Sequence, residues 1–216
     1  MPSTAECASR IIWTITAHNQ YYKATALPLT VEQTPLLGVI IITPVRYGDH
    51  RGFFSESYSS NALAEHGITT QFLQDNHSLS TTQGTIRGLH FQAPPHAQDK
   101  LVRCGRGALF DVAVDIRKGS PTYGQWFGIE LSFENGKQLL VPAGFAHGFV
   151  TRAPETEIIY KCSDYYAQET EGAVAWDDPQ VGIDWGLGEI APVLSEKDAN
   201  APSLADLHSP FTFEDV

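Results

Sequence analysis

From Leu29 onward, the pattern of hydrophobic and polar positions is typical of short β-strands. Runs of β-branched and aromatic residues alternate with turns rich in Gly, Pro, Asn and Asp, and helical periodicity is scarce. The clearest strand covers residues 110–116, where apolar residues alternate with Asp111, Ala113 and Asp115. We expect one face of this strand to meet a core and the other face to be polar.

A hairpin is predicted between residues 127–133 and 137–141. The two runs are joined through Asn135 and Gly136, and Asn-Gly is the strongest short hairpin signal because both residues accept positive φ.

The other predicted elements are strands over 157–162 and 172–176, a helix over 59–66 and a short helical start at 195–198. Many short strands with frequent turns favour a sandwich or barrel, and a double-sheet jelly roll is one such fold that protects strand edges. The sequence therefore predicts an all-β fold, a double-sheet jelly roll with a few short helices.

Residues 1–28 lack this pattern. They contain two basic side chains and the short apolar run Ile11-Ile12-Trp13, which is too little for the apolar region of a signal peptide. We expect residues 1–28 to be a poorly ordered N-terminal extension. We expect residues 29–216 to form a single domain, because a chain of this size buries most of its surface in one core.

The composition narrows the choice of partners and compartment. A formal net charge of −11 without a run of Lys or Arg disfavours a nucleic-acid partner, and no apolar run is long enough to span a membrane. The three cysteines form no CxxC pair, which favours reduced thiols and a cytoplasmic location.

Polar residues concentrate in residues 74–78 and 87–92 and at Lys100. A single histidine is more often a solvated or satisfied structural residue than a functional one. So many polar residues close together in β-rich segments nevertheless favour a pocket lined by these side chains. A few local cations there would bind a small anionic ligand despite the negative net charge.

The spacing of glycines, a proline and histidines resembles the two cupin motifs, at Gly84, His90, Gly107, Pro142, Gly144 and His147. The positions that hold metal ligands in metal-binding cupins are occupied here by His90, Gln92, Lys100 and His147. An ammonium has no lone pair and a carboxamide oxygen is a weak ligand, so we expect no metal. A histidine base beside a cation suits proton abstraction next to a carbonyl instead. Tyr160 is a candidate donor on the opposite face, although buried tyrosines are more often core residues.

Six segments in order resemble the dTDP-4-dehydrorhamnose 3,5-epimerase family. They are Arg51-Gly52-Phe53-Phe54-Ser55-Glu56, Gln74-Asp75-Asn76-His77-Ser78, Arg87-Gly88-Leu89-His90-Phe91-Gln92, Lys100-Leu101-Val102-Arg103, residues 142–149 and Tyr160-Lys161. The resemblance runs from about Leu29 to Ala201. Between Trp185 and Leu194 the chain departs from the family, because it is glycine-rich where the family continues into proline.

The resemblance implies a cupin-like jelly roll that forms a homodimer and uses no cofactor. It implies epimerisation of dTDP-4-dehydro-6-deoxy-α-D-glucose at C3 and C5 to dTDP-4-dehydro-β-L-rhamnose. His90 matches the general base, Tyr160 the proton donor, Asp198 the carboxylate that orients the histidine, and Lys100 the cation near the C4 oxygen. From the residues alone, Ser195 to Asp198 also form a helix capping box.

Substrate contacts carry over from the family to Arg51, Glu56, Gln74, Asn76, Arg87, His147, Glu171 and Lys197, with Tyr166 at the position that stacks on thymine. Guanidinium groups suit a diphosphate and an aromatic ring suits a base. For Arg51 or Glu171, a surface ion pair is the simpler interpretation without the family.

Three alternatives remain from the sequence. The protein could be a related enzyme that epimerises only C3 of a similar dTDP-keto-sugar. It could be a non-catalytic module that binds the sugar nucleotide, or a cupin oxygenase that uses a metal.

Overall fold

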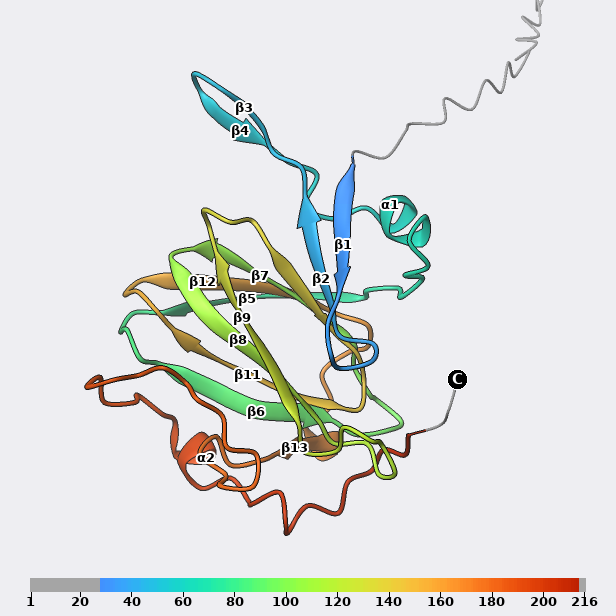
Figure 1. Ribbon diagram of the computed structural model, residues 1–216, viewed down its shortest axis with the longest axis vertical. Helices are drawn as coiled ribbons and strands as arrows, with labels where there is room; N and C mark the ends of the chain where they lie inside the picture. Colours follow the sequence, from blue (N-terminus) through green and yellow to red (C-terminus); the bar gives the residue numbers. More distant parts are fainter. Residues whose placement is uncertain (1–27, 214–216) are drawn as a thin grey trace, which may run out of the picture.

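A computed structural model describes residues 28–213 of the chain as two antiparallel sheets that face each other, with two short α-helices at their margins (Figure 1). This arrangement confirms the predicted all-β double-sheet jelly roll. The first sheet runs in the order β1 (Leu29–Gln33), β2 (Ile40–Pro44), β10 (Gln138–Val141), β7 (Lys100–Arg106), β12 (Thr156–Cys162) and β5 (Gln74–Ser80). The second sheet runs in the order β13 (Glu171–Ala173), β6 (Ile86–Gln92), β11 (Phe145–Thr151), β8 (Ala108–Asp115) and β9 (Trp126–Ser132).

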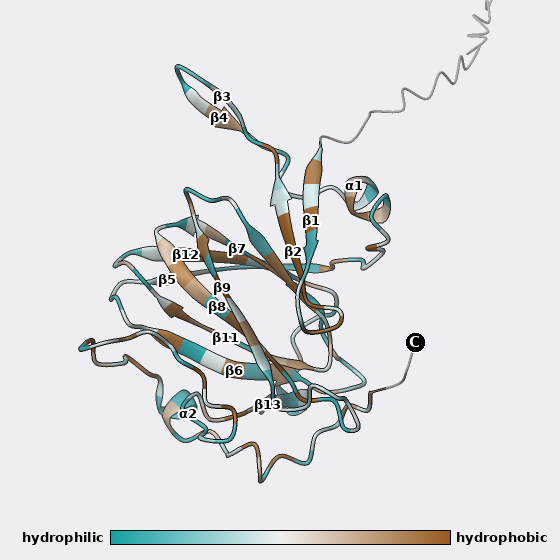
Figure 2. Cartoon of the chain, viewed as in Figure 1, coloured by the Kyte–Doolittle hydropathy of each residue, from teal (hydrophilic) through white to brown (hydrophobic). Residues whose placement is uncertain are grey.

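Three hydrophobic clusters hold these layers together. The first lies between the sheets and includes Val102, Leu109 and Phe149. A second packs the outer face of the five-stranded sheet against the C-terminal segment, and a third packs the six-stranded sheet against α1 (Ser60–Ala64). Hydrophobic residues accordingly concentrate on the strands of both sheets, whereas the connecting loops are largely hydrophilic (Figure 2).

The strand predicted over 110–116 is present as β8, but its polar face is buried. Asp111, Ala113 and Asp115 each have no exposed surface. The C-terminal segment covers the opposite face of β8, so both faces of this strand are internal. Its aspartates therefore need partners inside the protein.

The hairpin predicted from Asn135-Gly136 is wrong. The two strands around this turn belong to different sheets, because β9 pairs with β8 and β10 pairs with β2 and β7. Asn135 Oδ1 accepts the N–H groups of Ser132 and Lys137. Gly136 has a φ of 63°. The turn signal was therefore real, but it directs the chain from one sheet to the other.

The predicted short strands and helices agree better with the structure than the predicted hairpin does. The strand at 157–162 is present as β12, and the one at 172–176 is present as the shorter β13. Both helix starts are capped, with Ser59 preceding α1 and Ser195 preceding α2 (Glu196–Ala199).

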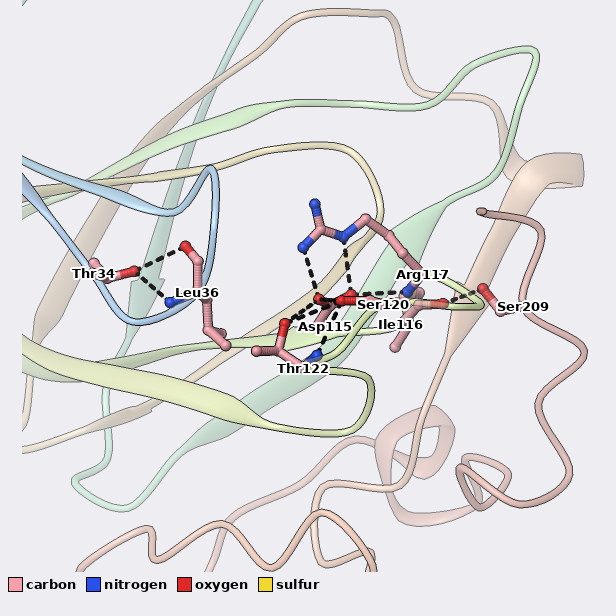
Figure 3. Close-up of polar contacts among 8 residues, drawn as sticks. All are labelled: Thr34, Leu36, Asp115, Ile116, Arg117, Ser120, Thr122 and Ser209. Carbon is pink, nitrogen blue, oxygen red and sulfur yellow. Dashed lines mark hydrogen bonds and ion pairs between the residues drawn. The ribbon is translucent and has the colours of Figure 1, made fainter. Parts of the chain in front are cut away.

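A polar network orders the β8–β9 connection, and Ser209 joins the C-terminal segment to it (Figure 3). Asp115 accepts hydrogen bonds from Arg117, from Ser120 at 2.6 Å and from Thr122 at 2.7 Å. Burial raises the pKa of Asp115, but these donors outweigh it and hold that pKa below the ordinary value. Ser209 donates to the carbonyl of the neighbouring Ile116.

A separate hairpin, β3 (Tyr47–Asp49) and β4 (Gly52–Phe54), projects away from both sheets (Figure 1). No helix of residues 28–213 has the length and apolar character needed to cross a membrane. The predicted extension over residues 1–28 lies outside the described residues except for Pro28. The division into an extension and one domain therefore stays a prediction.

Candidate active site

Strand β6 contributes to the site through an irregularity in its pairing with β11. His90 lies opposite His147 and Arg87 lies opposite Phe149, so β6 has one more residue than β11 between these pairs. A bulge of this kind resets the alternation of side chains. His90 and Arg87 consequently share the inner face with His147, while Ile86, Leu89 and Phe91 pack in the outer cluster.

His90 is held by a carboxylate from the distant C-terminal segment. Its Nε2 lies 2.5 Å from Asp198 Oδ1 in α2. Ser195 Oγ donates to Asp198 Oδ2 at 2.8 Å and accepts the Asp198 N–H at 3.1 Å. The Ser195 helix cap and the carboxylate partner of His90, which the sequence presented as alternatives, are thus both present. The second bond of a capping box, from the Ser195 N–H to the Asp198 carboxylate, is not found among residues 28–213. The departure of the chain between Trp185 and Leu194 does not displace Asp198, because Val193 returns to hydrogen-bond with Gly84 and Ile86.

The charge state of Asp198 determines which nitrogen of His90 is free. Burial raises the pKa of this carboxyl, but hydrogen bonds from His90 and Ser195 outweigh it, so the pKa is lowered. An ionised carboxylate only accepts, so Nε2 carries the hydrogen. The lone pair of the His90 ring is then on Nδ1.

A second histidine and aspartate lie on the same sheet. His147 Nε2 is 2.8 Å from Asp111 Oδ1. The other oxygen of Asp111, Oδ2, is buried without a hydrogen-bond partner among residues 28–213. Sequence analysis missed Asp111 as a site residue, although an aspartate within an apolar strand was a usable signal.

Lys100 begins β7 on the opposing sheet and shares the inner face with Val102, its second neighbour along the strand. Burial lowers its pKa, and the negative groups Asp111 and Glu171 partly offset the shift. Its side chain is partly buried, and no hydrogen bond or ion pair from it is found within the described part of the chain. An ammonium in this position is available to a ligand.

Tyr160 lies on β12 between Val102 of β7 and Asn76 of β5. It packs against the cluster between the sheets, so it faces the sheet that carries His90. Burial raises the pKa of Tyr160, and Asn76 and Arg87 partly offset the rise. The phenol therefore remains protonated, as a proton donor must.

A chain of hydrogen bonds connects this strand to the loop that carries Tyr166. Asn76 Nδ2 donates to Cys162 Sγ at 3.6 Å, and Gln74 Nε2 donates to Asn76 Oδ1 at 3.0 Å. Gln74 Oε1 then accepts the Tyr166 N–H at 3.1 Å. The Tyr166 ring is 57% exposed, so its face is free to stack on a base.

Two charged residues connect Tyr166 to α2. The Tyr166 hydroxyl donates to Glu171 Oε2 at 3.3 Å, and Lys197 Nζ lies 2.5 Å from Glu171 Oε1. Burial raises the pKa of Glu171, but the contact with Lys197 outweighs it and lowers that pKa. The interpretation of Glu171 as an ion-pair member is therefore also correct.

The carboxamide of Gln92 is fully engaged in hydrogen bonds to the backbone. Its Nε2 donates to the carbonyls of His96 and Tyr165, and its Oε1 accepts the Ala167 N–H. This side chain organises the loop after β12, which agrees with its dismissal as a metal ligand.

Most of the predicted site residues occupy this region, which is formed by facing strands and α2. Arg87 borders it, with its guanidinium near Ser80 Oγ and the Leu79 carbonyl. Arg51 lies elsewhere, since it pairs with Asp49 on the projecting hairpin. Glu56 lines a cavity of about 360 Å³ whose lining also includes Arg103, Tyr160 and Lys161.

The arrangement combines a histidine held in one tautomer, a protonated phenol on the facing sheet and a half-buried ammonium. Such a set can remove a proton beside a carbonyl, stabilise the enolate and return a proton from the other side.

Known proteins share both the sequence and the fold. A family model described as dTDP-4-dehydrorhamnose 3,5-epimerase matches residues 33–206. The dTDP-4-dehydrorhamnose 3,5-epimerase of Sinorhizobium fredii is 52% identical over 178 residues, which are 82% of this chain and 91% of that protein.

Two solved structures are also similar. The dTDP-6-deoxy-D-glucose-3,5-epimerase of Legionella pneumophila, in complex with dTDP-4-keto-L-rhamnose, has a TM-score of 0.83 and 45% identity, and the match covers 87% of this chain and all (100%) of that one. A 3'-monoepimerase of Streptomyces bikiniensis, in complex with dTDP-quinovose, has a TM-score of 0.75 and 35% identity, and the match covers 80% of this chain and 88% of that one. The chain described here belongs to the dTDP-4-dehydrorhamnose 3,5-epimerase family.

Proposed function

We propose that the protein epimerises dTDP-4-dehydro-6-deoxy-α-D-glucose at C3 and C5, giving dTDP-4-dehydro-β-L-rhamnose, without a cofactor. The observation that carries the proposal is the opposition of His90 and Tyr160 on facing sheets, with His90 fixed by the buried Asp198. Inversion of a carbon needs a base on one face of the sugar ring and a donor on the other, and the placement of His90 and Tyr160 on facing sheets supports these two roles.

In the proposed mechanism, the C4 carbonyl acidifies the hydrogens on C3 and C5. His90 Nδ1 removes one of them, while Lys100 stabilises the negative charge that develops on the C4 oxygen. Tyr160 then delivers its proton to the opposite face of the same carbon. His90 then loses its added proton to solvent and the Tyr160 phenolate regains one from solvent. The second carbon follows by the same steps, since both carbons flank one carbonyl.

The nucleotide is proposed to bind at the end of the site that carries Tyr166, with thymine stacked on its exposed ring. Gln74, Asn76, Arg87, His147, Glu171 and Lys197 complete the proposed contacts. The nitrogen and oxygen of the Glu171–Lys197 pair lie 2.5 Å apart, so binding that engages either group must compensate for this contact.

We further propose that Arg51 and Glu56 act in a homodimer, in which the projecting hairpin of one subunit completes the site of the other. The hairpin and α2 lie at opposite ends of the folded molecule (Figure 1). Arg51 therefore does not reach the His90 of the same subunit. The hairpin also exposes Phe53 and Phe54, at 45% and 65%, and exposed aromatic residues are typical of interfaces.

Complementation tests this arrangement. Arg51→Ala and His90→Ala proteins, each inactive, are mixed under conditions that exchange subunits. A mixed dimer would contain one intact site, so equal amounts should recover about a quarter of the wild-type rate if subunits pair at random. A mixture that stays inactive, although mixed dimers form, would contradict a site shared between subunits.

The activity is tested by incubation with the keto-sugar nucleotide in deuterated water, followed by NMR of the product. Label at both C3 and C5, with the L-rhamno product trapped by a reductase, is expected. Label at C3 alone would assign the protein to the C3-only enzymes, and binding without any label would indicate a non-catalytic module.

Cytoplasmic location is part of the proposal, because Cys104 and Cys162 are free thiols.

A further inference from the structure

We infer that Ser195 is a positioning residue for the proposed epimerisation, because its hydroxyl holds the Asp198 carboxylate in the orientation that presents Oδ1 to His90. The inference rests on the proposed function, since it concerns the base of that reaction. Ser195 contacts neither the ring of His90 nor the space between the sheets, and would act through Asp198.

The two oxygens of Asp198 have separate partners. Oδ1 faces His90 and Oδ2 accepts the hydrogen of Ser195 Oγ at 2.8 Å. Asp198 is only 4% exposed, and the Ser195 hydroxyl is the side-chain donor to Oδ2 that is found within residues 28–213. A carboxylate held at one oxygen alone can rotate about its side-chain bonds, whereas contacts at both oxygens fix its plane.

The hydroxyl also stabilises the ionised form of the carboxyl. Burial opposes ionisation of Asp198, and Ser195 is one of the two side chains that outweigh burial. The ionised carboxylate keeps the hydrogen of His90 on Nε2 and leaves Nδ1 free. Loss of the hydroxyl should therefore increase the fraction of the ring in the wrong tautomer.

Other contacts hold α2 in place without this hydroxyl. Backbone hydrogen bonds join Val193 to Gly84 and Ile86, Leu194 packs in the outer cluster, and Lys197 pairs with Glu171. Since Ser195 is itself exposed, small replacements should be accommodated. The capping contribution can therefore be separated from the positioning contribution.

The replacements differ in which bond they keep. Ser195→Thr keeps both bonds. Ser195→Gly retains most of the stability of an N-cap but has no hydroxyl, and Ser195→Asp caps well but presents a negative charge to Asp198. Ser59→Gly is the matched control, because Ser59 caps α1 through the Ala62 N–H at 3.4 Å and no bond from its hydroxyl to a carboxylate is found within residues 28–213.

The expected result is a loss of kcat of about 10- to 100-fold in Ser195→Gly and Ser195→Asp, the range for a hydrogen bond to a charged group. KM should change little, Ser195→Thr should be close to wild type, and Ser59→Gly should keep full activity. Nitrogen NMR of the His90 ring should show a single Nε2–H tautomer in the wild type and a mixture in the two impaired variants.

Wild-type kcat and an unchanged tautomer in a folded Ser195→Asp protein would overturn the inference, even if Ser195→Gly fails to fold. A threonine variant as impaired as the glycine variant would also overturn it. His90→Ala is measured in the same assay. Absence of epimerisation by the wild type would refute the proposed function itself, whereas an active wild type with an inactive His90→Ala would leave only Ser195 in question.

Discussion

His90 and His147 lie directly opposite each other on β6 and β11, and each ring is held by a carboxylate from a different part of the chain. Asp198 in α2 contacts His90 at 2.5 Å, and Asp111 in β8 contacts His147 at 2.8 Å. Asp198 arrives from outside the sheet, whereas Asp111 is part of it. The orientation of His90 therefore depends on the docking of the C-terminal segment, and that of His147 depends on the register of the sheet.

Asp198→Asn should reduce kcat by about 10²- to 10⁴-fold, the range for a positioned acid–base group, because a carboxamide no longer enforces the Nε2–H tautomer. Steady-state kinetics on the folded variant measures this. Activity within a few-fold of wild type would contradict the role of Asp198.

The same variant should change the pH dependence of stability. The pKa of Asp198 is lowered in the folded chain, so its contribution to stability is fully present above the ordinary carboxyl pKa of about 4 and is lost as the pH falls through the folded value. Wild type should be more stable than Asp198→Asn at neutral pH, and the difference should shrink below about pH 4. Urea unfolding across this range tests the prediction, and a difference that does not change with pH would refute it.

Lys100 should set the alkaline limit of activity. Burial lowers the pKa of Lys100, so we expect the loss of its proton to limit activity on the alkaline side. Lys100→Arg, which stays charged, should move the alkaline limb of kcat to higher pH. Lys100→Met should lose about 10²- to 10³-fold in kcat, as expected for removal of a group that stabilises an oxyanion. An unmoved alkaline limb in Lys100→Arg would assign that limb to another group.

The sequence contained the periodicity and the motifs of this fold, but not the relations between distant elements. The alternation in β8 was visible, yet its polar face is internal because the C-terminal segment covers the other side. Asn135-Gly136 gave the turn and could not show that its flanking strands join different sheets. Motif positions found His90, Lys100 and Tyr160, whereas the pairing of Asp111 with His147 depends on strand register.

Catalysis should be independent of metal ions. Lys100 occupies one cupin ligand position, and the amide of Gln92 at another is engaged by three backbone groups. Turnover should be unchanged after dialysis against a chelator, and metal analysis should find no stoichiometric ion. Activity that disappears on chelation and returns with one added divalent ion would contradict this prediction.

Removal of residues 1–27 should leave folding and turnover nearly intact. Pro28 is retained in this truncation because its carbonyl accepts the Val45 N–H at 3.1 Å. The truncated and full-length proteins are compared by melting temperature, molecular mass in solution and kcat. A large loss of any of these would show that the extension belongs to the functional structure.

The division of labour between His90 and Tyr160 is tested most directly by solvent exchange. In deuterated water, Tyr160→Phe should still incorporate label into the keto-sugar with retained configuration, because His90 continues to remove and return protons on its own face. His90→Ala should incorporate no label, because this variant lacks the group proposed to remove the proton. Positioned acid–base groups contribute about 10²- to 10⁴-fold each, so both losses of epimerisation are large enough to measure. Equal exchange by the two variants would contradict the assignment of His90 as the base and Tyr160 as the donor.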